Sequence, residues 1–258
     1  MLIVLSPAKS LDFASKPLTK RFTLPRFQDD SEMLVKVLAG QSPEEIAHLM
    51  SLSDELAELN WQRFQEWDPD AAAPGSRQAI LAFKGDTYLG LDVTRFSTRD
   101  FTAAQRRLRI LSGLYGVLRP LDLIQPHRLE MGTRLPTERG KNLYDFWGDQ
   151  VSDALASDLD ILRPRALVNL ASQEYFRSVR AGRLGARIVT PRFEDLSGGE
   201  YRVVSFFAKR ARGAMASWLI LNRITSLTGL TAFDGLGYRF DSGRSGRDRP
   251  TFVRERAV

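Results

Sequence analysis

The sequence predicts a mixed α/β protein of the α+β kind, folded as a single compact domain over residues 1–258. Short apolar runs of strand length alternate with longer segments whose apolar residues recur every three or four positions. No internal repeat or low-complexity linker interrupts this alternation. Because the chain has 258 residues and 43% of them are hydrophobic, it can build one sizeable core, which favours one domain over two small ones.

The first hundred residues are predicted to form one buried strand, an irregular arm and then mainly helices. Ser42 and Pro43, followed by two glutamates, are typical of a helix N-terminus, and Ser53 introduces a second helix that extends towards Trp67. The expected elements are, in order, a strand at 2–5, an ordered loop or arm at 7–29, two or three helices, a turn at 68–75, a buried strand at 79–83 and its hairpin partner at 87–89.

The remainder of the chain is predicted to alternate helices and strands more evenly. The expected helices are at 101–111 with Thr98 as the cap, at 142–156, from Ser172 onwards and at 206–226, and the expected strands are at 166–170, 187–190 and 201–205, the last two joined across a turn at 197–199. Residues 239–258, rich in Arg, Gly and Ser, are expected to include a flexible tail.

Composition excludes several classes of site. The chain has no cysteine, so disulfides, thiolate zinc sites and thiol catalysis are excluded, and two histidines cannot form a multi-histidine metal site. None of the patterns GxGxxG, GxxxxGK[ST], HExxH and GxSxG is present. We therefore expect no metal and no cofactor. The N-terminus lacks the features of a signal peptide, and no apolar run reaches about 18 residues, so we expect a cytoplasmic protein without a membrane partner.

The charge of +6 is unevenly distributed. Residues 1–100 carry 11 Lys and Arg against 15 Asp and Glu, whereas residues 101–258 carry 26 against 16, a surplus of ten positive charges. Such a surplus indicates a phosphate-bearing polyanion as a partner, although preferential use of arginine (30 of the 37 basic residues) explains it equally well.

Residues 101–124 resemble a helix-hairpin-helix. A helix at 101–111 precedes Gly113 and Gly116, which can adopt positive φ, and residues 117–124 are predicted to form a second helix. In such elements the free backbone N–H groups of the hairpin bind a DNA phosphate without recognising sequence. The spacing between the two glycines is one residue longer than the usual Gly-x-Gly, and an ordinary turn between two helices is the alternative.

Three further segments place polar side chains in apolar surroundings. The first follows the N-terminal strand and contains Ser6, Lys9, Ser10 and Asp12. The second leaves the strand at 166–170 and contains Asn169, Ser172, Gln173, Glu174 and Tyr175, where Ser172 also suits a helix cap. The third opens the longest helix and contains Lys209, Arg210 and Arg212, for which a solvated helix face is the alternative, together with Gly213, which suggests close backbone packing or the approach of a ligand.

Together, these blocks resemble the YaaA family of bacterial peroxide-stress proteins. The blocks that carry the resemblance are MLIVLSPAKSLDF (1–13), AILAFKGDTYLGL (79–91), LRILSGLYGVLRPLDLIQPHRLEMGTRL (108–135), LVNLASQEYF (167–176) and KRARGAMASW (209–218). They are long and unusual, and they follow one another along nearly the whole chain. Two departures are His127, where family members often have Tyr, and the Arg-rich residues 239–256.

The resemblance implies a cytosolic protein that limits oxidative damage to DNA, with a fold peculiar to the family, a positively charged cleft and a helix-hairpin-helix. It implies binding of double-stranded or branched DNA without a base-specific code, and it implies no established reaction. Candidate DNA contacts in this sequence are Lys9, Gly113, Gly116, Arg119, Arg128, Lys209, Arg210 and Arg212, with Ser6, Asn169, Ser172, Gln173 and Tyr175 as further cleft candidates.

Two further hypotheses remain open. The first is an enzyme that acts on DNA or a nucleobase in the manner of a glycosylase or lyase. It would use Lys9 as nucleophile and a carboxylate as acid or base, for which the candidates are Asp12, Glu130 and Glu174. The second, iron sequestration, lacks a suitable set of ligands. The oligomeric state is not predicted.

Overall fold

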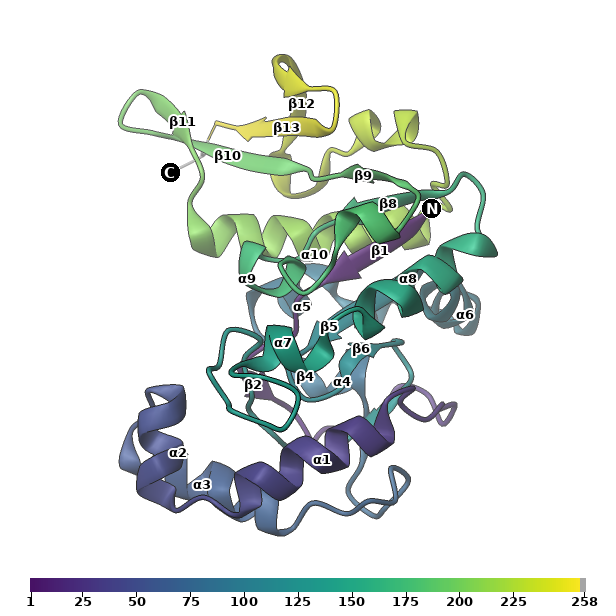
Figure 1. Cartoon of the computed structure of the whole chain (residues 1–258). Helices are drawn as coiled ribbons and strands as arrows, with labels where there is room; N and C mark the ends of the chain where they lie inside the picture. The colour runs from purple at the N-terminus through teal and green to yellow at the C-terminus, as the bar shows by residue number, and fades with distance from the viewer. Residues whose placement is uncertain (256–258) are drawn as a thin grey trace.

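The computed structural model describes residues 1–255, and a five-stranded sheet with the order β6-β5-β1-β8-β9 lies at its centre (Figure 1). β1 (Leu2–Leu5) pairs in parallel with β5 (Leu108–Ser112) on one side and with β8 (Ala166–Asn169) on the other. β9 (Arg187–Val189) continues the sheet in parallel beyond β8, and β6 (Gly116–Leu118) closes the opposite edge as an antiparallel strand. The mixed α/β class and the strands predicted at 2–5, 166–170 and 187–190 are confirmed.

The inner strands are buried along their whole length. Every residue of β1, β5 and β8 is buried, which is typical of parallel strands whose two faces are both covered. The covering elements include α10 (Ser205–Leu221), which packs along β1, and α8 (Gln150–Asp160), which contacts β6 (Figure 1). The long C-terminal helix that the sequence predicts is thus present and lies against the central strand.

A second sheet has the order β11-β10-β13-β12 and lies at the top of Figure 1. β10 (Arg192–Ser197) and β11 (Glu200–Arg202) form a hairpin over the glycine turn, so the predicted connection from strand 187–190 across this turn is wrong. β12 (Arg239–Gly246) and β13 (Arg249–Arg254) extend the sheet. Most of the segment predicted as a tail therefore consists of paired strands, because Thr251, Phe252 and Val253 supply buried side chains. Residues 256–258 of that prediction lie outside the described residues.

Three helices form the base of the molecule in Figure 1. They are α1 (Gln28–Ala39), α2 (Pro43–Met50) and α3 (Asp54–Gln65). The Ser42 side chain accepts the Glu45 N–H while the Glu45 carboxylate accepts the Ser42 N–H, so the predicted start of α2 is confirmed as a capping box.

The two strands predicted at 79–83 and 87–89 are wrong. Residues there form α4 (Ala79–Ala82) and α5 (Asp86–Leu91), separated by β4 (Phe83–Lys84), which pairs with β2 (Ser10–Leu11). β3 (Arg77–Gln78) precedes α4. The AILA run is buried on all sides, and a short apolar run in such surroundings has no periodicity that separates a strand from a helical turn.

The predicted helix-hairpin-helix is also wrong. α6 (Thr98–Arg107) ends four residues before the predicted end, and the glycines join β5 to β6 in a β-hairpin. Residues 117–124 contain β6 and β7 (Leu123–Ile124), which pairs with β3, and form no helix. The run after α6 becomes a strand because it fills the position between β1 and β6, a tertiary contact that local periodicity does not reveal.

The predicted helix at 142–156 is divided into two. α7 (Leu143–Trp147) ends at Gly148, whose φ is +48°, and α8 follows. Ser172 caps α9 (Gln173–Phe176), as predicted, by accepting the Tyr175 N–H. The remaining elements are short 3-10 helices: η1 (Val93–Arg95), η2 (Ala181–Arg183), η3 (Thr228–Ala232) and η4 (Gly235–Gly237). Across residues 1–255, none of the helices combines the length and apolarity needed to cross a membrane.

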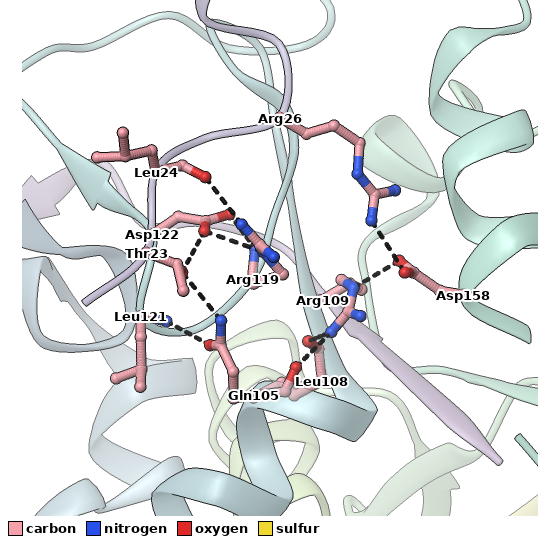
Figure 2. A network of polar contacts seen from close by, with 10 residues as sticks. All are labelled: Thr23, Leu24, Arg26, Gln105, Leu108, Arg109, Arg119, Leu121, Asp122 and Asp158. Carbon is pink, nitrogen blue, oxygen red and sulfur yellow. Dashed lines mark hydrogen bonds and ion pairs between the residues drawn. The ribbon is translucent and has the colours of Figure 1, made fainter. Parts of the chain in front are cut away.

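The N-terminal arm is fixed to this framework by two buried carboxylates (Figure 2). The Asp122 side chain accepts hydrogen bonds from the Thr23 hydroxyl and the Arg119 guanidinium. Asp158 receives Arg26 and Arg109 at 2.9 and 2.7 Å. Burial alone would raise the pKa of Asp158, but the two arginines outweigh it and lower the pKa below its usual value.

Candidate functional site

A cavity of about 340 Å³ lies beyond the carboxyl ends of β1 and β8. This volume lies within the range of small-ligand sites. Its lining comes from six separate parts of the chain. These are residues 6–10 after β1, residues 83–87 around α5, Ser112 at the end of β5, and residues 127–130 after β7. Leu170, Ser172, Glu174 and Tyr175 after β8 and Lys209 with Arg212 on α10 complete the lining.

The base of the cavity is a set of hydrogen bonds that joins the ends of the two central strands. The Ser172 N–H donates to the Ser6 Oγ at 2.8 Å, and the Leu170 N–H donates to the Val4 carbonyl. The Tyr88 hydroxyl of α5 donates to the Ser6 carbonyl at 3.1 Å. The sequence SPAKS after β1 therefore turns at a fixed place, and the side chains that follow Ser6 line the cavity.

The predicted lysine and glutamate meet inside this lining. Lys9 Nζ lies 2.9 Å from Glu130 Oε1, which also accepts a hydrogen bond from Arg128 at 3.1 Å. The Lys9 side chain is 64% exposed, so this pair is largely hydrated and contributes little to stability. Glu174 lines the same cavity, where its Oε1 accepts the Gly132 N–H at 3.0 Å.

Tyr175 and His127 are two titratable side chains of the cavity lining that are neutral at pH 7. Burial, followed by the nearby charges of Glu174 and Glu130, raises the pKa of Tyr175 far above its usual value, so the hydroxyl stays protonated. Burial also lowers the pKa of His127 to about 4, and the charge of Arg63 acts in the same direction. The imidazole is therefore neutral at pH 7, with Nδ1 2.8 Å from the Gln125 carbonyl oxygen.

Three cations of the cavity have no carboxylate partner among residues 1–255. They are Lys84, Lys209 and Arg212. Lys209 and Arg212 are three residues apart on α10 and therefore share one face of the helix. Burial lowers the pKa of Arg212, but a guanidinium remains charged at neutral pH. A half-buried charge without a counter-ion is a favourable place for an anion.

A second cavity of about 500 Å³ shares Arg212 with the first. Its lining includes Asn169, Gln173, Arg177 and Thr190. The Asn169 amide lies near the Thr190 hydroxyl at 3.4 Å, and the guanidinium of Arg177 lies over the ring of Tyr144. Arg212 thus stands between two hollows at the same edge of the sheet.

Of the predicted site residues, the structure brings ten to the first cavity. They are Ser6, Lys9, Ser10, Arg128, Glu130, Ser172, Glu174, Tyr175 and Arg212 with its neighbour Lys209, and His127 joins them. Asn169 and Gln173 line the second cavity instead.

Five predicted residues line neither cavity. The Asp12 carboxylate accepts hydrogen bonds from the backbone and side chain of Ser15, which makes it part of a local turn. Arg119 belongs to the network of Asp122. Arg210 is exposed on α10 outside both linings.

The two predicted hairpin glycines, Gly113 and Gly116, are buried and have packing roles. A Cβ on Gly113 would lie 2.3 Å from the Leu129 carbonyl oxygen. Gly116 has a φ of +64°, and a Cβ there would lie 2.8 Å from the ring of Trp147. Neither backbone faces a surface that a phosphate could reach.

Sequence reasoning missed the contribution of Lys84, Asp86 and Thr87 to the cavity. These residues were assigned to a hairpin of strands, whereas Gly85 precedes the first turn of α5 and places them beside residues 6–10. The signal that was available is an acidic residue directly after Lys-Gly, which suits the first turn of a helix. Within the described residues, no group of three His, Cys, Asp or Glu side chains is placed to hold a metal ion.

Comparison with known proteins gives matches over the whole length of the chain. A family described as "Peroxide stress protein YaaA" matches residues 1–244. A protein of Cellvibrio japonicus (strain Ueda107) named "UPF0246 protein" is 47% identical over 258 residues, which cover 100% of both chains. A protein of the same name from Cupriavidus metallidurans (strain ATCC 43123 / DSM 2839 / NBRC 102507 / CH34) is 51% identical over 257 residues, which cover 98% of both chains.

Proposed function

Because the chain belongs to the YaaA family of peroxide stress proteins, we propose that it binds DNA in the peroxide stress response and limits oxidative damage to that DNA. The observation that carries the proposal is the group of three unpartnered cations, Lys84, Lys209 and Arg212, on one cavity at the carboxyl edge of the parallel sheet. DNA phosphates are the anions that such cations neutralise, and the contacts would be independent of sequence.

Charge counting supports this proposal. Lys9, Lys84, Arg128, Lys209 and Arg212 contribute five positive charges to the first cavity, against three negative charges from Asp86, Glu130 and Glu174, while His127 is neutral. The cavity therefore has a positive balance even after its internal ion pairs are counted. We place the protein in the cytoplasm, where it would meet DNA.

A salt titration of duplex binding tests the proposal. We expect affinity to fall by about tenfold or more between roughly 50 and 200 mM salt, since even a few released counterions give a steep slope. Lys209→Gln combined with Arg212→Gln should weaken binding and reduce the salt slope by about two, one for each phosphate contact. Arg99→Gln is the matched control, because Arg99 is an exposed arginine of α6 outside both cavities.

The proposal fails if the parent does not bind duplex DNA at low salt. It also fails if the control variant loses as much affinity as the double variant, because the cavity would then have no special part in binding. Thermal melting of each variant should accompany the titration, so that a loss of folded protein is not mistaken for a loss of affinity.

A second candidate function is catalysis on DNA, and the convergence of Lys9, Glu130 and Glu174 on one cavity favours it. An amine can attack the aldehyde of an abasic site, with loss of water, to form an imine that borohydride reduces to a stable covalent link. A covalent complex with the parent that is absent from Lys9→Arg would support a lyase. Absence of any covalent complex with the parent would leave DNA binding alone.

A further inference from the structure

The order of the strands singles out one place on the sheet edge. Along the chain, β1 is followed by β5 and β6 on one side of the sheet, and then by β8 and β9 on the other. In open sheets of this kind, ligands bind beyond the carboxyl ends of the strands where this order reverses. That point lies between β1 and β8, where the Ser172 N–H meets the Ser6 Oγ. The first cavity opens at this position.

The lining of the cavity requires an occupant of mixed chemistry. Lys84, Lys209 and Arg212 favour an anion, because no carboxylate of residues 1–255 pairs with them. Glu174 also forms no ion pair within residues 1–255, and its carboxylate presents a hydrogen-bond acceptor to the same cavity. A simple anion would satisfy the cations but would be repelled by this carboxylate.

A nucleotide combines the two requirements. Its phosphate pairs with Lys or Arg, and the exocyclic amino group of cytosine, adenine or guanine donates to a carboxylate. We infer that the first cavity holds a single nucleotide, with its phosphate at Lys209 and Arg212 and its base against Glu130 and Glu174. That the nucleotide belongs to a DNA strand, rather than being free, rests on the proposed function.

A base inside a duplex cannot reach such a cavity while it remains stacked. It must first leave the helix, at an energetic cost that is smallest for bases that are already unpaired. The cavity would therefore select DNA that contains an unpaired nucleotide. Fully paired duplex would bind only through contacts between its phosphates and the cations of the protein, with no base inside the cavity.

The first experiment measures binding of free deoxycytidine monophosphate, deoxythymidine monophosphate and inorganic phosphate by titration calorimetry. We expect the cytidine nucleotide to bind tightest, because thymine lacks the exocyclic amino group. Arg212→Gln should weaken its binding about tenfold, as loss of a charge-assisted hydrogen bond does, whereas Arg99→Gln should not. Equal binding of cytidine nucleotide and inorganic phosphate, or equal effects of the two variants, would overturn the inference.

The second experiment identifies the source of the nucleotide with two duplexes that have the same number of phosphates. One contains an unpaired cytosine, and the other contains an abasic site at the same position. We expect the parent to prefer the unpaired cytosine by about fivefold or more, and Glu174→Ala to lose that preference while it still melts as a folded protein.

The outcomes separate the two proposals. If the parent binds duplex DNA without preferring the unpaired cytosine, the inference that the cavity holds a nucleotide of a DNA strand is wrong. The proposed function then remains intact. Failure of the parent to bind any duplex overturns the proposed function, and the mononucleotide titration then decides whether the cavity is a site for free nucleotides.

Discussion

His127 shows how a single side chain of the cavity links burial to pH. Its ring packs edge-on against Tyr115 and Phe83, with centroids 5.2 and 6.4 Å away. Because burial lowers the pKa to about 4 from an ordinary value of 6.5, the fold prefers the neutral imidazole. The unfolded chain therefore takes up the proton first as the pH falls. Stability is lost from about pH 6.5 downwards, and the loss is complete near pH 4.

We expect His127→Phe to remove this dependence. Between pH 7 and pH 5, the free energy of unfolding of the parent should fall by about 2 kcal/mol more than that of the variant. Urea unfolding of both proteins at the two pH values measures the difference. If the gap between parent and variant is the same at both pH values, the proton on His127 is not linked to folding.

At the scale of single residues, the sequence was sufficient to identify site residues that follow strands closely. Ser6, Lys9 and Ser172 could be placed because side chains after parallel strands meet at one edge of a sheet. Arg119 was assigned to DNA, but its partner Asp122 is buried by contacts with the N-terminal arm, which the local sequence does not reveal. Whether a cation is free or paired depends on the fold.

At the scale of elements, the crossing of α5 and α10 positions the cations of the cavity. A Cβ on Gly213 would lie 1.7 Å from the Thr87 carbonyl oxygen, and a Cβ on Gly90 would lie 2.0 Å from that of Arg210. The two helices therefore touch backbone to backbone, which confirms the close packing suggested by a glycine inside the longest helix. This contact holds Lys209 and Arg212 beside the residues of α5.

Gly213→Ala distinguishes this packing from helix propensity. Helix propensity alone predicts that alanine raises the free energy of unfolding by about 1 kcal/mol. Because the new methyl group must push the helices apart, we expect the free energy of unfolding to fall by about 1–3 kcal/mol instead. Gly182→Ala is the control, since nothing lies within 4 Å of its Cβ position and its φ is not positive. A stabilised Gly213→Ala variant in urea unfolding would contradict the backbone contact.

Other elements show where a local pattern is sufficient to predict structure. The capping residues of α2 and α9 and the buried strands β1 and β8 follow from local chemistry, and they were predicted. The β5-β6 hairpin and the single turn of α4 were missed, because both depend on neighbours distant in sequence. In each case the packing around a short, buried apolar run, and not the run itself, determined whether it became a helical turn or a strand.

For the whole molecule, the pairing of charges indicates where an anionic partner would bind more specifically than the net charge of +6 does. Many arginines after residue 100 are committed to internal ion pairs, among them Arg109 with Asp158 and Arg254 with Asp195. Each such pair is locally neutral, so the surplus of ten positive charges resides on the cations that form no such pair. The unpartnered cations of the cavity then become the more specific indication of an anionic partner.

The positions of the methionines determine which of them peroxide can oxidise in the folded protein. The chain has no cysteine, and its methionines differ widely in exposure. Met131 and Met215 are fully buried, Met131 directly after Glu130 of the cavity, whereas Met33 is 37% exposed and Met50 is partly exposed. Oxidation of methionine to the sulfoxide follows exposure. The methionines whose oxidation would disrupt the core are therefore shielded.

We expect peroxide to oxidise Met33 and Met50 well before Met131 and Met215, and duplex affinity to remain unchanged at that stage. Peptide mass spectrometry after timed exposure to peroxide, with a mobility-shift assay on the same samples, measures both quantities. In urea the protection should disappear and the methionines should oxidise at similar rates, because the order depends on the fold alone. Early sulfoxide on Met131 or Met215 in folded protein would show that peroxide reaches the core next to the cavity.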